Sequence, residues 1–343
     1  MKNTEVINKF YKNKIKIKAK RIGRPEEIPE TRQEYIACKK ERRLKLKPQM
    51  YQTAGRQKTP MQKLLPYLLI LPAMLLFFCF NYYPFIKAVV LSFSLTDKTG
   101  HVSKWVGLSN WERVIGKSSF WNVISITLKM AGINLVFTFL LALLFALLCV
   151  KKVRFSRVYQ TMYALPMAIA SSPAAAIFLF IYRQKNGILN NLLGTEIGWT
   201  TQTPQAIWAV CGMTIWMNIG VSFVFLLVGF RNVSEDILES AWLDGAGPLQ
   251  RIRHILIPMA SPQLFFVLFL NISTSFRSFA QIKLLTGGGP ANGTKNLIYY
   301  IYENAIINGR FETACVQAIF LFLLILGVTA IQFALEKKVV FYQ

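Results

Sequence analysis

Three basic side chains, Lys129, Arg277 and Lys283, stand inside long apolar stretches of the chain. A charge at the centre of a bilayer costs about 2.5–3.5 kcal/mol on insertion scales, so such a residue needs a polar partner or an anionic ligand. Arginine suits a phosphate or a carboxylate, because its planar guanidinium donates two parallel hydrogen bonds. We therefore favour a functional role for Arg277, as a contact for an anionic substrate or for a partner group.

The segment 271–279 around this arginine is a polar island within an apolar stretch. Its amide and hydroxyl groups recur every three to four residues, at Asn271, Thr274 or Ser275, and Ser278, which places them on one helix face. This spacing predicts a stripe that faces a transport pathway. Hydrogen bonding between helices, worth about 0.6 kcal/mol per contact, is an equally good explanation of the hydroxyls.

No catalytic constellation, metal site or cofactor site is expected. The two histidines, His101 and His254, fall on opposite sides of the membrane in the topology given below. The glycine run in 284–290 lacks the Lys-Ser/Thr of a phosphate-binding loop, so it predicts a flexible turn and no ATP site. The five cysteines are scattered and without a CxxC pair, which favours small core residues over disulfides or zinc ligands.

The elements that carry these residues are membrane helices. With 343 residues, 53% hydrophobic content and a mean hydropathy of +0.37, the chain is too apolar for a water-soluble domain. Each apolar stretch approaches or exceeds the roughly 20 residues that a spanning helix needs. We predict an all-α membrane protein with six transmembrane helices, at about 64–94, 120–150, 158–182, 205–230, 259–284 and 312–335.

The net charge of +24 is concentrated near the N-terminus, where residues 1–63 hold 19 Lys/Arg against six Glu. We predict a basic, largely disordered cytoplasmic extension over 1–63 and a six-helix transmembrane domain over 64–343. We expect no signal peptide, because no short apolar core with a cleavage site follows the first basic residues. The extension either attracts anionic lipid headgroups or is a solvated tail that fixes topology. Nucleic acid is not an expected partner, because no binding motif is present.

The distribution of basic residues predicts the orientation. The tail, the short loop 151–157, the loop 231–258 and the C-terminus together hold 28 Lys/Arg, whereas the loops on the other side hold eight. Basic residues accumulate on the cytoplasmic side of membrane proteins. Both termini and the loop 231–258 are therefore predicted to be cytoplasmic.

The segment 239–258 is too polar to cross a bilayer and lies between two apolar stretches. A helix over 239–243 is predicted to end at Gly245 and Gly247, and a second helix over 249–257 is predicted to end at Pro258. Two short helices joined at a glycine elbow would project from the membrane domain. A plain amphipathic helix on the membrane surface is the alternative on composition alone.

The order of residues in this segment is Glu-x-Ala, then Asp-Gly-Ala, then Ile-x-x-Ile-x-Ile-Pro. It resembles the coupling loop of binding-protein-dependent ABC importer permeases. The resemblance implies a coupling helix that docks on a cytoplasmic ATPase through Glu239, Ser240, Ala241, Asp244, Gly245, Ala246, Ile255 and Pro258. Ser240 stands where the family usually has Ala, and Ile252 where it often has Phe; both changes keep the local character.

The segments 284–290, 296–302 and 336–342 resemble the carbohydrate-uptake branch of these permeases, which serves sugars and glycerol 3-phosphate. The resemblance runs from about residue 64 to the end, and the chain is similar to the first permease subunit of a two-permease system. In sugar permeases of this branch, helices before and after the coupling loop touch the substrate. Matched by position, this implies substrate contacts at Thr274, Ser275 and Ser278 and, more loosely, at Gly220 and Phe223.

Taken together, the resemblance implies one permease subunit of an ATP-driven importer in the bacterial cytoplasmic membrane. Its expected partners are a second permease subunit, two copies of a cytoplasmic ATP-binding subunit that hydrolyses the ATP, and an extracytoplasmic solute-binding protein. The substrate is a carbohydrate or, alternatively, glycerol 3-phosphate or another anionic polyol. An ion-driven secondary transporter is the rival class; it predicts internal repeats and intramembrane acidic residues, and neither is found within the predicted spans.

Overall fold

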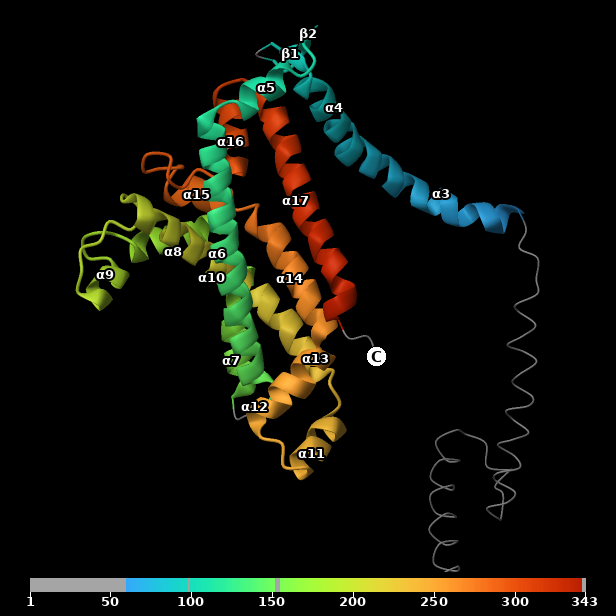
Figure 1. The fold of residues 1–343 in the computed structure, drawn as a ribbon, viewed down its shortest axis with the longest axis vertical. Coiled ribbons are helices and arrows are strands. Elements are labelled where there is room, and N and C mark those ends of the chain that lie inside the picture. Colours follow the sequence, from blue (N-terminus) through green and yellow to red (C-terminus); the bar gives the residue numbers. More distant parts are fainter. Residues whose placement is uncertain (1–59, 98, 152–154, 341–343) are drawn as a thin grey trace, which may run out of the picture. The chain divides into compact units, whose positions relative to one another are not determined.

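The computed structural model describes residues 60–97, 99–151 and 155–340 (Figure 1). The chain divides into two compact units, of which the first ends at Phe80 and the second begins at Asn81. The predicted extension over 1–63 lies outside the described residues except for 60–63, which form the first turn of a helix. The proposed boundary between residues 63 and 64 stays a prediction.

In the described part of the chain, four helices are long and apolar enough to cross a membrane, as expected for four of the six predicted segments. The first combines α3 (Pro60–Phe77), a π-helical turn η1 (Phe78–Tyr82) and α4 (Tyr83–Ser92). Pro60 begins α3, a position where the missing N–H of proline costs nothing. The four spans are Leu64–Ser92, Ser118–Cys149, Thr203–Arg231 and Phe311–Glu336.

Each of the two other predicted segments is broken by a bend, which the sequence analysis did not predict. In the third, α7 (Ser156–Ala164) and the 3₁₀ turn η2 (Leu165–Ala168) meet α8 (Ser171–Ile181) at 105°. In the fifth, residues Pro248–Met259 meet α14 (Ser261–Ser275) at 72°. Prolines flank each break, at 166 and 173 in the third segment and at 258 and 262 in the fifth, and proline favours a helix start or a bend over a continuous helix. Six spans result if each bent pair counts as one.

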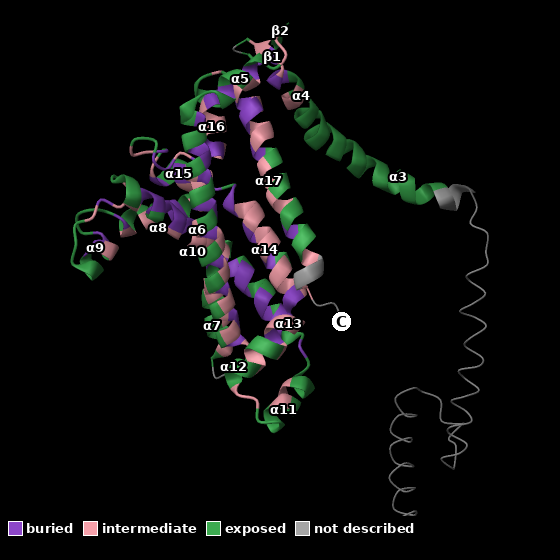
Figure 2. Ribbon diagram, in the orientation of Figure 1, coloured by how far each residue is buried: buried purple, intermediate pink, exposed green. Residues whose placement is uncertain are grey.

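The second unit is built around three long helices that pack along one another. Helix α6 (Ser118–Cys149) lies along α10 (Thr203–Arg231), and α14 contacts both. Helix α17 (Phe311–Val339) packs on α14 and on α4. Figure 2 shows buried residues where these helices meet and exposed residues on their outer faces. Those outer faces are apolar, as at Leu140, Leu144 and Leu148, which suits contact with lipid.

Buried apolar side chains form three clusters along these helices. We call the cluster beside the predicted cytoplasmic loops the inner cluster and the two others the outer clusters. The inner cluster holds Ala142 of α6, Phe223 and Phe230 of α10, and Val267 of α14. One outer cluster is centred on α8 and α10, and the other joins α6 to α17. The polar residues of α6, α10 and α14 described below therefore lie between separately packed ends of the bundle.

A short β-hairpin, which the sequence did not predict, follows the first span. Strand β1 (Ser94–Thr96) pairs antiparallel with β2 (Val102–Trp105), and α5 (Ser109–Ile115) follows. Asn110 Nδ2 donates hydrogen bonds to the Ser92 and Ser94 carbonyls, at 3.1 and 2.8 Å, and so fixes the hairpin to the helix end. In the connecting turn, hydrogen bonds from the Thr99 hydroxyl and the His101 N–H lower the pKa of the Asp97 carboxyl.

A short helix, α9 (Ile188–Leu193), follows α8. Two further short helices, α15 (Ala280–Leu285) and α16 (Leu297–Tyr302), flank the glycine-rich segment that was predicted to be a flexible turn, and a π-helical turn η4 (Glu303–Ile307) follows α16. The turn is held from both sides. Tyr299 Oη donates to the Gly287 carbonyl at 2.9 Å, and Thr294 Oγ1 donates to the Gly289 carbonyl at 2.7 Å. The glycine run is therefore a braced loop.

Candidate functional site

The predicted coupling segment forms a corner of two helices, as expected. Helix α11 (Glu235–Leu243) ends at a glycine elbow in which the Gly245 N–H bonds to the Trp242 carbonyl and the Ala246 N–H bonds to the Ala241 carbonyl. This is a Schellman cap, and Gly245 has a φ of +83°, a conformation that glycine adopts without strain. The predicted end of the first helix at Gly245 is confirmed.

The second helix of the corner is longer than predicted. It comprises α12 (Pro248–Arg251), a π-helical turn η3 (Ile252–Leu256) and α13 (Ile257–Met259). The Gln250 side chain accepts a hydrogen bond from the Gly247 N–H at 2.8 Å and stabilises the start. Pro258 does not end this helix, because the π turn before it tolerates the missing N–H, and the bend comes at Ala260. We call residues 235–259 the inner corner.

One side of the inner corner is anchored and the other is exposed. Leu238, Ile252 and Ile255 pack against the inner apolar cluster. In contrast, Trp242, Leu243 and Leu249 expose 63%, 79% and 75% of their surface. The acidic Glu239 and Asp244 are also exposed, as are Ser240 and Gly245, whereas Ala241, Ala246 and Pro258 are half-buried. An apolar patch on a rigid elbow is suited to docking a partner.

A cavity of about 660 Å³ lies beside α11, and the exposed Trp242 is part of its lining. Its lining includes Glu235 and Glu239 of α11, Arg231 of α10 and Arg251 of α12. Arg231 donates to the Cys149 carbonyl at 3.0 Å and so caps the last turn of α6, where a cation complements the helix dipole. The cavity thus carries both signs of charge, at the point where the ends of α6 and α10 meet the inner corner.

The predicted pathway stripe lies mostly inside the subunit. Asn271 is buried, and its Oδ1 accepts a hydrogen bond from the Ser222 hydroxyl of α10 at 3.0 Å. Ser275 is buried, and Thr274, which is half-buried, bonds to the carbonyls of Leu270 and Asn271. These contacts fit hydrogen bonding between helices, and a role in the pathway remains a prediction.

Arg277 and Ser278 do not continue the stripe, because α14 ends at Ser275. The expectation of one helix face from 271 to 278 is therefore wrong. Ser278 is buried in the following turn, and its carbonyl accepts a hydrogen bond from Asn296 Nδ2 at 3.0 Å. Arg277 is exposed, and its guanidinium has no hydrogen-bond or ion-pair partner among the described residues. Its charge is available to a group outside this part of the chain.

Gly220 and Phe223 face another helix of the same subunit. A methyl group on Gly220 would lie 3.1 Å from the Ala164 carbonyl oxygen and 3.3 Å from Met167 Cβ. Phe223 is 1% exposed and meets the Tyr163 ring edge to face at 5.5 Å. Glycine here permits α10 to approach the α7–η2 segment closely.

Sequence reasoning missed several buried polar residues of α6 and α10. Asn134 and Thr138 of α6 are each 2% exposed, and Thr214 of α10 is 1% exposed. Both amide atoms of Asn134 are buried without a partner among the described residues. A polar residue repeated at a four-residue spacing within an apolar stretch was the available signal, and it predicts a helix contact.

The family assignment agrees with this architecture. Residues 140–341, which include the inner corner and three of the long helices, match the model for the binding-protein-dependent transport system inner membrane component. The chain belongs to this family. It is therefore a multi-pass inner-membrane permease.

Relatives and solved structures extend over most of the permease. It is 32% identical over 287 residues to the sn-glycerol-3-phosphate transport system permease protein UgpA of Yersinia enterocolitica, covering 81% of this chain and 96% of the relative. Identity to UgpA of Agrobacterium fabrum is 31% over 284 residues, covering 82% and 97%. A bacterial ABC transporter involved in the import of the acidic polysaccharide alginate has the same fold, with a TM-score of 0.73 at 22% identity, covering 81% of this chain and 97% of that chain.

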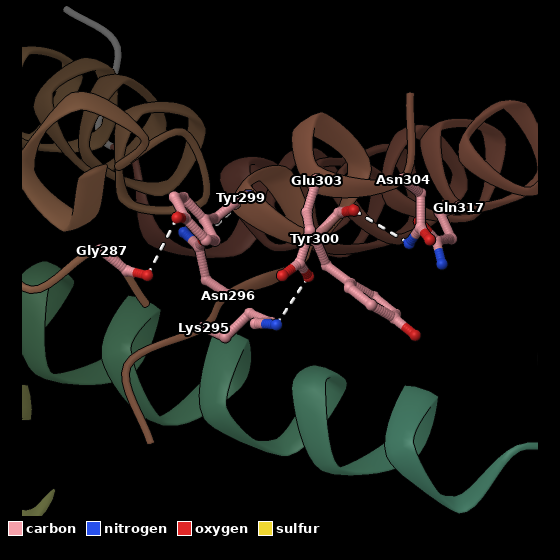
Figure 3. A network of polar contacts seen from close by, with 8 residues as sticks. All are labelled: Gly287, Lys295, Asn296, Tyr299, Tyr300, Glu303, Asn304 and Gln317. Carbon is pink, nitrogen blue, oxygen red and sulfur yellow. Dashed lines mark hydrogen bonds and ion pairs between the residues drawn. The ribbon is translucent and has the colours of Figure 1, made fainter. Parts of the chain in front are cut away.

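The permease has a second polar region around α16, which we call the outer corner and define by residues 277–304 (Figure 3). Lys295 and Glu303 form an ion pair at 2.6 Å, with the two side chains 11% and 26% exposed. Asn296 caps α16 by accepting from the Tyr299 N–H at 3.0 Å. The Asn304 amide donates to Gln317 of α17 at 3.2 Å. These contacts hold α16 to its own segment and to α17.

One carboxylate of the permease corrects an expectation about acidic residues. Glu312 is the first residue of the sixth predicted span, and it is 8% exposed. Its Oε2 accepts a hydrogen bond from the Thr96 hydroxyl of β1 at 2.5 Å. The predicted spans therefore do contain an acidic residue, at one end, and its contact with the hairpin accounts for its burial.

Proposed function

We propose that this permease forms one half of the membrane pathway of an importer powered by a separate ATP-binding subunit, which docks on the inner corner. The observation that carries this proposal is the inner corner itself. It exposes Trp242, Leu243 and Leu249 on a glycine-capped elbow. A helix that is anchored on one side and apolar on the other needs a covering partner.

The anchoring contacts give the corner a way to move the membrane helices. Leu238 and Ile255 join the cluster that contains Ala142 of α6 and Phe223 of α10. Because packed cores transmit strain, a shift of α11 would move the inner ends of both helices. Helix α14 follows the inner corner directly, after the 72° bend, so a movement of the corner would also move α14. ATP-driven movement of the docked subunit would thus change access to the pathway.

The partners follow from the family and from this geometry. A second permease subunit would complete the pathway. One ATP-binding subunit would dock on the inner corner of this permease, and a second copy would dock on the other permease. An extracytoplasmic binding protein would deliver the substrate. The predicted orientation places both termini and the inner corner in the cytoplasm. This orientation is supported by the 28 Lys/Arg of the tail and inner loops against eight in the outer loops.

The substrate class we propose is a carbohydrate or a polyol derivative such as glycerol 3-phosphate. The relatives named for sn-glycerol 3-phosphate cover about four fifths of this chain at 31–32% identity. The exposed Arg277 supports an anionic member of this class, because a guanidinium binds phosphate or carboxylate with two hydrogen bonds.

Reconstitution in vesicles tests the proposal. The permease, its second permease and the ATP-binding subunit are placed in vesicles, with the binding protein outside and ATP inside. We expect uptake of the cognate sugar or polyol phosphate to require ATP and the binding protein. Uptake that proceeds without ATP and follows an imposed proton or sodium gradient would overturn the proposal. It would favour the secondary-transporter alternative, for which Glu312 would be the coupling candidate.

A further inference from the structure

The ammonium group of Lys283 is held in a fixed position on an aromatic platform. Its Nζ lies 3.0 Å from Tyr302 Oη, 4.4 Å from the centre of the Tyr302 ring and 5.7 Å from that of Phe279. The two rings meet edge to face with their centres 5.0 Å apart. A cation over an aromatic face is attracted by the ring quadrupole, so the long side chain loses its usual freedom.

This charge has no carboxylate partner in the described part of the chain. Glu303, the residue after Tyr302, is already paired with Lys295 at 2.6 Å. Lys283 is exposed, as is Arg277, and both lie in the segment between α14 and α16. Two unpaired cations beside a membrane helix are costly unless water or an anion reaches them.

The platform is rigid because the structure braces it from behind. Tyr299, whose ring centre is 6.1 Å from those of both Phe279 and Tyr302, donates its hydroxyl to the Gly287 carbonyl. The Leu297 N–H at the start of α16 donates to Thr127 Oγ1 of α6 at 2.8 Å. The cation is therefore presented by a preorganised surface, which lowers the entropy cost of binding.

We propose that Lys283, with Tyr302 and Phe279, contacts the anionic group of the transported solute and so selects a phosphorylated polyol or a uronate over a neutral sugar. Rings suit the carbon face of a sugar or polyol, and the ammonium suits its phosphate or carboxylate. This inference rests on the proposed function and assigns the substrate class to a named residue.

The test uses the reconstituted importer in vesicles of neutral phosphatidylcholine. The probes are sn-glycerol 3-phosphate, a galacturonate trisaccharide and the neutral maltotriose. For whichever anionic probe is carried, we expect Lys283→Gln to raise KM about tenfold, the size of a lost charge-assisted hydrogen bond. Lys283→Arg should stay within about threefold of the wild type, because it keeps the charge.

Lys185→Gln is the matched control, since Lys185 is exposed in the segment between α8 and α9 and has no ring contact in the described structure. It should leave KM unchanged. Equal effects of the two variants would overturn the assignment, because they would indicate a general effect of surface charge. Transport of maltotriose and of neither anionic probe would also overturn the assignment of Lys283, but it would leave the proposed function intact. Uptake of no probe in the presence of ATP would instead refute the proposed function.

Two other sources of the anion are separated by further measurements. If Lys283→Gln is defective only in vesicles that contain phosphatidylglycerol, the lysine binds a lipid headgroup. If the variant no longer co-purifies with the second permease, the lysine pairs with a carboxylate of that subunit. Either result would overturn the proposal. An unchanged complex with a raised KM for the anionic probe in both kinds of vesicle would support it.

Discussion

The inner and outer corners of this permease are both short helices joined by glycine-rich turns, yet they treat their polar and apolar groups in opposite ways. The inner corner exposes Trp242, Leu243 and Leu249 to the surroundings. The outer corner pairs Lys295 with Glu303 and ties Tyr299 back to the chain. Under the proposed function another molecule covers the first surface, whereas the second forms most of its polar contacts within the chain.

The difference separates two kinds of glycine turn. At the inner corner, Gly245 ends a helix, and the space next to its Cα is open. At the outer corner, a methyl group on Gly288 would lie 2.8 Å from the Tyr299 ring. A side chain added at Gly245 would have free space and could contact a docked partner. A side chain added at Gly288 would collide with Tyr299 and disturb the packing of the permease itself. Substitutions at the two corners should therefore affect assembly and stability, respectively.

Gly245→Asp should have the largest effect. The carboxylate would be buried against the docked subunit, and an unpaired buried charge is among the costliest changes in a protein contact. We expect the permease to insert in the membrane and lose the ATP-binding subunit, with ATP-dependent uptake abolished. Co-purification of the two subunits from detergent measures the loss.

Gly245→Asn is the matched control, because asparagine also tolerates a positive φ but carries no charge. It should retain much of the association. If both variants bind the ATP-binding subunit as the wild type does, the inner corner is not the docking surface. If both fail, the shape of the elbow, and not charge, controls docking.

Glu303→Gln should destabilise the outer corner without affecting assembly. It leaves Lys295, which is 11% exposed, without its carboxylate. Loss of one member of a partly buried pair costs about 1–3 kcal/mol. We expect a lower midpoint of thermal unfolding in detergent and unchanged co-purification with the ATP-binding subunit.

The double variant Lys295→Met/Glu303→Gln removes both charges and should recover part of the stability. Further loss in the double variant would show that each side chain acts separately. A loss of the ATP-binding subunit in Glu303→Gln would contradict the division between the two corners.

The features that follow from local sequence were predictable. The elbow at Gly245 and the four unbroken spans follow from glycine, proline and apolar length, which act over a few residues. The bends at the third and fifth spans were missed, because apolar length alone does not show where a helix breaks. Prolines at 166, 173, 258 and 262 were the available warning.

Contacts across the fold were not predictable. The spacing of Asn271 and Ser275 indicated a shared face, but not whether that face meets a pathway or another helix. Asn271 accepts a hydrogen bond from Ser222 of α10, which lies 49 residues away from it along the chain. Arg277 was placed inside a helix because it stands within the long apolar stretch 259–284, whereas α14 ends two residues before it. Tertiary packing sets both outcomes.

Asn271→Leu tests whether the buried stripe packs helices or conducts substrate. Leucine has a similar volume, and the Ser222 hydroxyl keeps its second acceptor, the Asn218 carbonyl at 3.2 Å. If the amide only joins α10 to α14, the loss should be about 1 kcal/mol, with uptake within about threefold of the wild type. Thr274→Val, on the half-buried side of α14, is the control.

A drop in uptake of more than tenfold for Asn271→Leu, in a protein of normal stability, would restore the pathway assignment. A drop for Thr274→Val alone would move the pathway to the less buried side of α14. Initial uptake rates and unfolding midpoints, measured on the same preparations, distinguish these outcomes.

Gly220→Ala should have the smallest effect, and its sign is informative. Alanine gains about 0.5–1 kcal/mol over glycine in a helix. Here the added methyl group would crowd the Ala164 carbonyl at 3.1 Å, and overpacking costs about 1–3 kcal/mol. We expect a slight net destabilisation. Gly132→Ala in α6, where nothing lies within 4 Å of the added carbon, should be slightly stabilising instead.

The pair of variants isolates the contact between α10 and the α7–η2 segment, because the change in helix propensity is the same at both sites. Equal shifts of the unfolding midpoint would mean that the segment moves aside and the close approach at Gly220 is not needed. Opposite shifts would place Gly220 at a tight helix contact inside the subunit. In that case a direct substrate contact at this position is ruled out, because the Ala164 carbonyl and Met167 already fill the space that a solute would need.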